Sequence, residues 1–264
     1  MTDLRVVRVL APNPGPFTLE GTNTWVVGSG PVLVIDPGPD EPSHLDAVLE
    51  QAGTIEAILL THHHPDHAPG AAALGKMAGA PVMAASPVEG ERALEDGMTV
   101  EAAEVSLHVL AAPGHTPDHV VFFARDAGAL FTGDAVLGRG TSVIDPPEGD
   151  LAAYLRSLEA MLALEPDVIY PGHGPVVRPA VATLREYLDH RRQREQQVLR
   201  ELRKGARTPE EMVPSIYAGY PADLYPAAAR SLLAHLIKLE QGGVVARESG
   251  SGDRFTLLDG SGIT

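Results

Sequence analysis

The stretch that decides the fold is Ile55-Glu56-Ala57-Ile58-Leu59-Leu60 followed by Thr61-His62-His63-His64-Pro65-Asp66-His67. Its first half is short and apolar, which is typical of a buried β-strand. Its second half places four imidazoles and a carboxylate next to one another. A core offers no partners for so many imidazoles, and a solvated loop has no use for them. The stretch therefore predicts a buried strand that ends in a ligand-binding loop.

The spacing within the loop separates its ligands into two sets. Side chains alternate along an extended chain, so His62 and His64 point the same way while His63 points away. Pro65 then redirects the chain, which lets Asp66 and His67 face a second, neighbouring point. We therefore expect the loop to serve two adjacent metal positions and His63 to serve neither.

Three later segments resemble one another and follow predicted strands. They are Pro113-Gly114-His115-Thr116, Thr132-Gly133-Asp134 and Pro171-Gly172-His173-Gly174. Ligand sites in α/β sheets gather at strand ends, so we expect these segments to meet the first loop. Together with His62, His64, Asp66 and His67 of the first loop, they supply five imidazoles and two carboxylates, the inventory for two metals with a shared carboxylate and open positions.

The composition is that of an ordinary folded chain. It has 264 residues, of which 44% are hydrophobic and 21% charged, enough for one large domain with a small appendage. No apolar run approaches the roughly 20 residues that a membrane helix needs. The chain has no cysteine, and its N-terminus lacks the features of a signal peptide. We therefore expect a cytoplasmic protein without membrane contact.

Strand and helix patterns alternate up to about residue 175. Strands are expected at 4–10, 23–29, 31–36, 55–60, 105–111, 119–124, 129–132 and 167–170, and helices at 43–52, 69–79 and 150–163. This order predicts layered α/β structure with helices outside the sheets, in a catalytic domain over residues 1–178.

Residues 179–264 have a different character. The expected elements are a helix over 179–204, a helix that begins at Thr208-Pro209, a helix over 226–240 and strands over 243–247 and 254–257 joined by a turn over 249–253. Three helices followed by a hairpin predict a winged-helix-like module. Such a module could equally be a dimer contact or a lid beside the site.

The charge is strongly acidic but uneven. The net charge is −15, yet residues 185–207 hold eight basic and four acidic side chains. One interpretation is a solvated helix face of mixed charge, and the other is an anion-binding stripe. Under the second, Arg191, Arg192 and Arg194 are expected to contribute to RNA binding.

On these motifs, in this order over roughly residues 15–175, the chain resembles the metallo-β-lactamase-fold hydrolases. The segment Asn13–Trp25 and the winged-helix tail make it most similar to the β-lactamase-like protein 2 family, across nearly its whole length. The resemblance implies an α/β (α+β) fold, a four-layer αββα sandwich with a C-terminal winged-helix-like module. It also implies that seven side chains hold two metals: His62, His64 and His115 the first, Asp66, His67 and His173 the second, and Asp134 both.

The implied chemistry is hydrolysis by a hydroxide that bridges the metals. Asp66 is expected to orient this hydroxide and to take its proton. Zinc is the default for a histidine-rich site, and iron or manganese suits the same donors.

Five further residues are candidates for supporting roles. Asp36 is expected either to support a ligand or to cap its own turn. Asp118 and His119 follow His115 closely and are expected to support ligands or to form core hydrogen bonds. Thr22 and Asn23 lie on a loop that could overhang the site and contact substrate.

The leading substrate hypothesis is single-stranded RNA, because the resembled family includes endoribonucleases and the basic stripe would attract phosphates. The alternative is a small ester or thioester, as in hydroxyacyl-glutathione thioesterases of the glyoxalase II kind or lactonases, with weak β-lactamase activity on the side. A second alternative is a winged-helix nucleic-acid-binding protein. The absence of a cysteine ligand counts against a secreted antibiotic-resistance β-lactamase.

Overall fold

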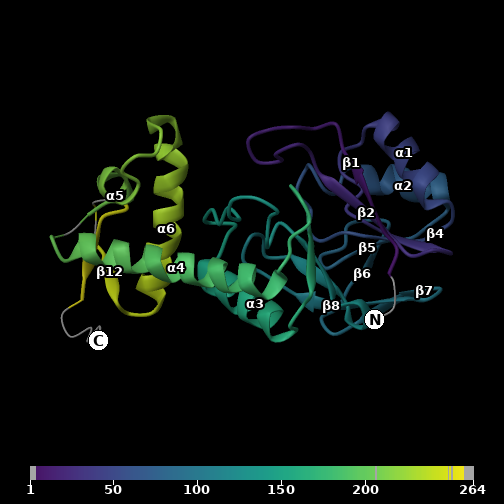
Figure 1. Ribbon diagram of the computed structural model, residues 1–264. Coiled ribbons are helices and arrows are strands. Elements are labelled where there is room, and N and C mark those ends of the chain that lie inside the picture. The colour runs from purple at the N-terminus through teal and green to yellow at the C-terminus, as the bar shows by residue number, and fades with distance from the viewer. Residues whose placement is uncertain (1–3, 206, 249, 251, 259–264) are drawn as a thin grey trace. The chain divides into compact units, whose positions relative to one another are not determined.

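The computed structural model describes residues 4–205, 207–248, 250 and 252–258 (Figure 1). The chain forms two compact units that interleave along the sequence. The first comprises residues up to Pro113, Asp118–Ser142 and Ser157–Leu184; the second comprises Gly114–Pro117, Val143–Arg156 and the residues from Arg185 onward. The domains expected at 1–178 and 179–264 stay a prediction.

The first sheet of the first unit has six strands, in the order β1 to β6. They are β1 Val6–Leu10, β2 Asn23–Val27, β3 Val32–Ile35, β4 Ile55–Leu59, β5 Val82–Ala84 and β6 Glu91–Ala93. Helices α1 (Pro42–Ala52) and α2 (Gly70–Ala78) contribute Leu45, Val48 and Leu74 to a buried cluster with Val34 and Ile58 of this sheet. Both helices therefore cover one face of the sheet.

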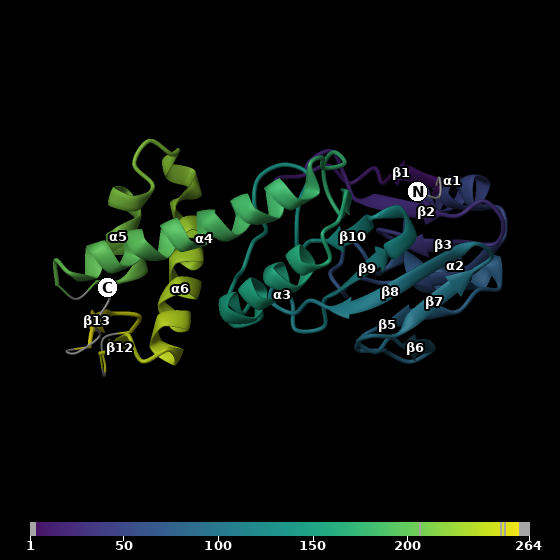
Figure 2. The ribbon, with the colours of Figure 1, turned by 60° about the horizontal axis from the view of Figure 1, so that its bottom comes forward.

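The second sheet packs against the other face of the first. Its order is β11 (Val168–Pro171), β10 (Ala129–Gly133), β9 (Val120–Ala124), β8 (Val105–Ala111) and β7 (Thr99–Ala102), with β7 to β10 visible in Figure 2. Trp25 and Leu33 of the first sheet share a buried cluster with Phe122 and Phe131 of the second.

Helix α3 (Leu151–Ala163) completes the layers. It lies in the chain between β10 and β11, which pair in parallel and so require a crossover connection. Crossover helices of this kind pack on a face of the sheet whose strands they join. This is the αββα order that was predicted. Strands β5, β6 and β7 were not predicted, because three or four residues are too few to show an alternating pattern.

The second unit contains the predicted winged helix. Its elements are α4 (Ala180–Leu202, which begins in the first unit), α5 (Pro209–Ile216), the short 3-10 helix Ala222–Leu224, α6 (Tyr225–Gln241), β12 (Val245–Arg247) and β13 (Phe255–Leu257). Thr208 caps α5 together with Glu211, as its sequence indicated. In the predicted turn over 249–253, Ser249 and Ser251 lie outside the described residues. No helix in the described ranges is long and apolar enough to span a bilayer.

The structure bears on the anion-binding interpretation of α4, which was one of the two that the sequence left open. Arg191 and Arg194 are only 4% and 8% exposed. Arg194 donates to the carbonyl of Ile216 at 3.2 Å, and its guanidinium lies 4.0 Å from the ring centre of Tyr217. Both arginines therefore serve the interior of the unit, and neither can offer its charge to RNA. Of the three named arginines, Arg192 alone is exposed.

The buried His235 is expected to make the second unit sensitive to acid. Its Nδ1 lies 4.0 Å from Oε2 of Glu195, which also accepts from Lys238 at 2.6 Å. Burial outweighs the attraction of Glu195, and the charge of Arg191 adds to it, so the pKa of His235 falls from 6.5 to about 4. The unfolded chain therefore binds a proton that the folded chain resists. The resulting stability is present above pH 6.5 and is lost as the pH falls through 4.

We expect the His235→Leu variant to lose less free energy of unfolding than the wild type between pH 6.5 and pH 4. Urea unfolding followed at several pH values measures the difference. Carboxylates titrate in both proteins, so only the difference between the two slopes is informative. Equal slopes would contradict the assignment.

Candidate metal centre

The ligand loop begins directly after β4 and is anchored by Asp36. The amide and the hydroxyl of Thr61 donate to the two oxygens of Asp36, at 2.8 and 2.7 Å. Nδ1 of His67 donates to Oδ2 of Asp36 at 2.9 Å. The loop then turns, with the amide of His67 bonded to the carbonyl of His64 at 3.0 Å. Asp36 therefore supports a candidate ligand directly, which resolves the two alternatives left open by the sequence.

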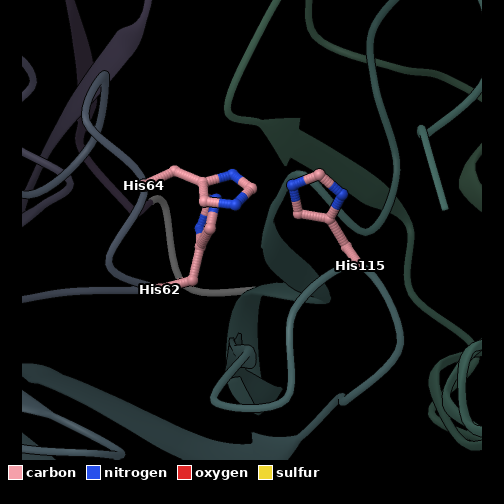
Figure 3. A group of neighbouring side chains, drawn as sticks. All are labelled: His62, His64 and His115. Atoms are coloured by element: carbon pink, nitrogen blue, oxygen red, sulfur yellow. The ribbon is translucent and has the colours of Figure 1, made fainter. Parts of the chain in front are cut away.

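His62, His64 and His115 form the first ligand group. One ring nitrogen from each lies within 4.8 Å of the other two (Figure 3). Because the Thr61 hydroxyl donates its proton to Asp36, Nδ1 of His62 must donate to Thr61, at 2.9 Å. Nδ1 of His115 likewise donates to the carbonyl of Val143 at 2.7 Å. These bonds fix the tautomers and leave Nε2 as the ligand atom.

Asp66, His67, Asp134 and His173 form the second ligand group. Nε2 of His67 and Nε2 of His173 lie 3.2 Å apart. Each lies 3.4 Å from Oδ1 of Asp134, and Nε2 of His173 lies 3.0 Å from Oδ2 of Asp66. Nδ1 of His173 donates to the carbonyl of Gly21 at 3.3 Å. The bridging role expected of Asp134 stays a prediction, because these distances join its Oδ1 to the imidazoles of the second ligand group.

The second ligand group stabilises positive charge. Burial opposes the charged forms, but the charge of His67 and the hydrogen bond from His173 hold the pKa of Asp134 well below its usual range. Burial also opposes the charged form of His173, but hydrogen bonds to Asp134 and Asp66 raise the pKa of His173 to about 9. The second ligand group therefore holds protons at the positions where a metal would bind. A metal that binds there would have to displace those protons. A divalent cation is a stronger source of the same positive charge.

The residues present fit two divalent metals. The donors are imidazole nitrogens and carboxylate oxygens, which zinc, iron and manganese all accept. Space is also kept for them: a Cβ at Gly172 would lie 2.7 Å from Oδ1 of Asp134 and 2.7 Å from Cε1 of His67. Glycine is therefore required beside the second ligand group.

The Gly172→Ala variant is expected to lose metal from the second ligand group and to be less stable by about 1–3 kcal/mol, as overpacked sites are. Elemental analysis and urea unfolding measure the two effects. Gly30→Ala is the matched control, because its Cβ would meet its nearest neighbour, Ala103, at 3.4 Å. A Gly172→Ala protein with full metal content would contradict the expectation.

Thr22 and Asn23 lie beneath the centre. Both side chains are fully buried, so neither overhangs the site. The Asn23 side chain donates to the carbonyls of Pro171 and Gly174, at 2.9 and 2.8 Å, on either side of His173. Thr22 forms an isolated bridge with His173. These residues fix the turn that carries a candidate ligand.

Asp118 and His119 belong to neither ligand group. Nε2 of His119 accepts from the amide of Asp134 at 3.2 Å, and its ring stacks on His62 at 4.9 Å between centres. Asp118 bonds His63, whose Nδ1 lies 2.7 Å away, while Nε2 of His63 lies 3.0 Å from Glu91. His63 therefore connects the ligand loop to two other segments. No sequence signal marks Glu91, which lies 28 residues from His63.

The models of two protein families match the sequence. "Metallo-beta-lactamase superfamily" matches residues 17–90 and 77–173, and "Beta-lactamase associated winged helix domain" matches residues 208–254. A "Beta-lactamase-like protein 2 homolog" of Drosophila melanogaster is 36% identical over 95% of this chain and 92% of its own. An "Atrochrysone carboxyl ACP thioesterase" of Aspergillus chevalieri is 35% identical over 98% of this chain and 88% of its own.

Solved structures show the same fold. A metallo-beta-lactamase family protein from Thermus thermophilus has a TM-score of 0.79 at 24% identity, over 96% of this chain and 98% of its own. The protein TTHA1623, solved in a di-iron-bound form, has a TM-score of 0.56 at 31% identity, over 66% of this chain and 96% of its own. Sequence and fold agree: the chain belongs to the metallo-beta-lactamase superfamily of hydrolases and carries a beta-lactamase-associated winged helix.

Proposed function

We propose that this enzyme hydrolyses thioesters at a two-metal centre formed by the two ligand groups. Asp66 carries the proposal. Its side chain is 25% exposed, whereas those of Asp134, His173 and His67 are 13%, 1% and 0% exposed. Asp66 is therefore the member of the second ligand group that entering water and substrate reach most easily.

In the reaction, water attacks the acyl carbon and Asp66 accepts the proton that the water loses. The carbon–sulfur bond then breaks and the sulfur leaves as a thiolate, which solvent water protonates while Asp66 returns its proton to solvent. Without metals, burial acts against ionisation of Asp66, but the hydrogen bond from His173 and the charge of His67 lower the pKa of its carboxyl. Bound metals would replace those protons as the source of positive charge beside it. When bound, two metals supply Lewis acidity and lower the pKa of water. Asp36 holds His67 and Thr61 in place throughout.

Charge favours a small acyl substrate over RNA. The net charge is −15, and a surface of this sign repels a polyanion. Arg191 and Arg194, expected to contact RNA, are buried. A relative that is similar along 98% of this chain is described as an acyl carrier protein thioesterase. The donors suit zinc, and the di-iron form of a similar protein makes iron the alternative.

Single-stranded RNA is the second candidate. It is supported by the basic side chains of α4 and the residues after it that remain exposed: Arg185, Arg192, Arg200, Arg203 and Lys204. This support is weak, because Arg192 pairs with Asp189 at 3.3 Å and Lys204 with Glu201 at 2.6 Å.

A substrate panel tests the proposal. Zinc-loaded and iron-loaded protein would receive a hydroxyacyl thioester, a lactone, labelled single-stranded RNA and a chromogenic cephalosporin. We expect thioester turnover at least tenfold above that of the other substrates, and its loss in the His173→Ala variant. RNA cleavage that disappears in His173→Ala, without thioester turnover, would return the assignment to RNA. Cleavage that persists in the variant would indicate a contaminating nuclease.

A further inference from the structure

The candidate ligand His115 lies on a four-residue segment, Gly114–Pro117, that belongs to the same compact unit as the winged helix. This segment is far in sequence from α4 and α6. Within the unit, however, it is held from two directions. In the first direction the contacts start at Arg191 of α4, and in the second they start at Arg230 of α6.

The first direction runs through α3. Gly114 has a φ of +143°, and a Cβ there would lie 2.4 Å from Cα of Tyr154, so the backbone of Gly114 rests directly on the helix. The carbonyl of Gly114 also accepts from the amide of Asp150 at 2.9 Å. Tyr154, whose side chain is fully buried, therefore packs against the segment that carries His115 through its backbone and Cβ.

Arg191 of α4 is in contact with this ring. Its guanidinium carbon lies 5.4 Å from the ring centre of Tyr154, and the arginine is 4% exposed. A buried guanidinium is costly to keep, and a cation–π contact offsets only part of that cost. The contact gives the buried arginine a role: it holds the side chain of the residue whose backbone and Cβ lie against Gly114.

The second direction runs through the segment after residue 142. Nδ1 of His115 donates to the carbonyl of Val143 at 2.7 Å. Two residues further on, Nε of Arg230 donates to Oδ1 of Asp145 at 2.5 Å, and Nη2 of the same arginine donates to the carbonyl of Pro146. Arg230 belongs to α6 and thus restrains the chain that orients the imidazole of His115.

We propose that the winged-helix unit positions the ligand His115 through Arg191 and Arg230, so that metal affinity depends on two arginines outside both ligand groups. The inference rests on the proposed function, because it takes His115 to be a ligand. Partners that orient a ligand typically change metal affinity about 10- to 100-fold when they are lost. Both arginines are therefore positioning residues.

Cobalt titration of the metal-free, full-length protein tests this inference. The visible absorption of bound Co²⁺ reports its ligands, and the titration gives stoichiometry and dissociation constants without any substrate. For Arg230→Ala and Arg191→Met, we expect one of two bound equivalents to weaken at least tenfold, with the spectrum shifted toward that of His115→Ala. Arg156→Ala is the matched control, because Arg156 is an exposed arginine two residues from Tyr154 on α3.

Circular dichroism and urea unfolding of the metal-free variants separate lost positioning from lost folding. Should Arg191→Met fail to fold, the exposed Arg230 decides the outcome by itself. Cobalt dissociation constants within twofold of the wild type in the folded variants would overturn the inference and leave the proposed function intact. A wild-type protein that binds no cobalt would overturn both.

Discussion

The Asp66→Asn substitution is expected to lower kcat for thioester hydrolysis about 100- to 10,000-fold, the range typical of a lost proton acceptor. Asparagine has nearly the same shape but cannot accept the proton that attacking water loses. It also removes a negative charge 3.0 Å from His173. KM is expected to change much less, because the role proposed for Asp66 concerns the proton of the attacking water and not the binding of the substrate.

Steady-state kinetics with the metal content measured in each preparation gives the comparison. Two controls make it specific. Asp126→Asn alters an exposed carboxylate on the 3-10 helix Arg125–Ala127, outside both ligand groups, and should leave kcat unchanged. Asp66→Glu restores a carboxylate and should recover part of the activity. A kcat within tenfold of the wild type in fully loaded Asp66→Asn would exclude Asp66 as the proton acceptor.

The candidate ligands were predictable because their signal is local. An apolar strand followed by four imidazoles has few explanations, and β4 with its loop lies where the sequence placed it. The second ligand group brings Asp134 and His173 to Asp66 and His67 because each follows a strand, and strands of a sandwich end at shared edges. The alternatives for Asp36 could not be separated from sequence, because its partner His67 lies 31 residues away.

The sequence left two interpretations of α4 open, and the anion-binding one overestimated the exposed positive charge for a physical reason. The count of charged residues over 185–207 assumed that every arginine in the segment is exposed. The helical spacing carried better information: Leu184, Leu188 and Val198 are buried, and Arg191 continues the same stripe at intervals of three and four. A basic residue on an apolar stripe indicates an interior contact. No comparable signal marks Arg230, whose partner Asp145 is 85 residues distant.

Removing both metals is expected to lower the melting temperature by about 16–32 °C. A ligand present at about a thousand times its dissociation constant stabilises the folded state by about 4 kcal/mol, so two metals contribute about 8 kcal/mol. For a chain of this size, each kcal/mol corresponds to about 2–4 °C. The buried members of the second ligand group add to the effect, because without a cation they must hold protons against the cost of burial. Differential scanning calorimetry of chelated and reloaded protein measures the shift.

Variants of single ligands assign that shift to the two ligand groups. His173→Ala removes an imidazole from the second ligand group, and His115→Ala removes one from the first. Each variant is expected to retain about one equivalent of metal and part of the stabilisation, because the other group keeps its donors. Loss of both metals in either variant would mean that the two positions fill together, as a shared carboxylate such as Asp134 would require. A melting temperature unmoved by zinc, iron or manganese in the wild type would contradict a metal centre at these residues.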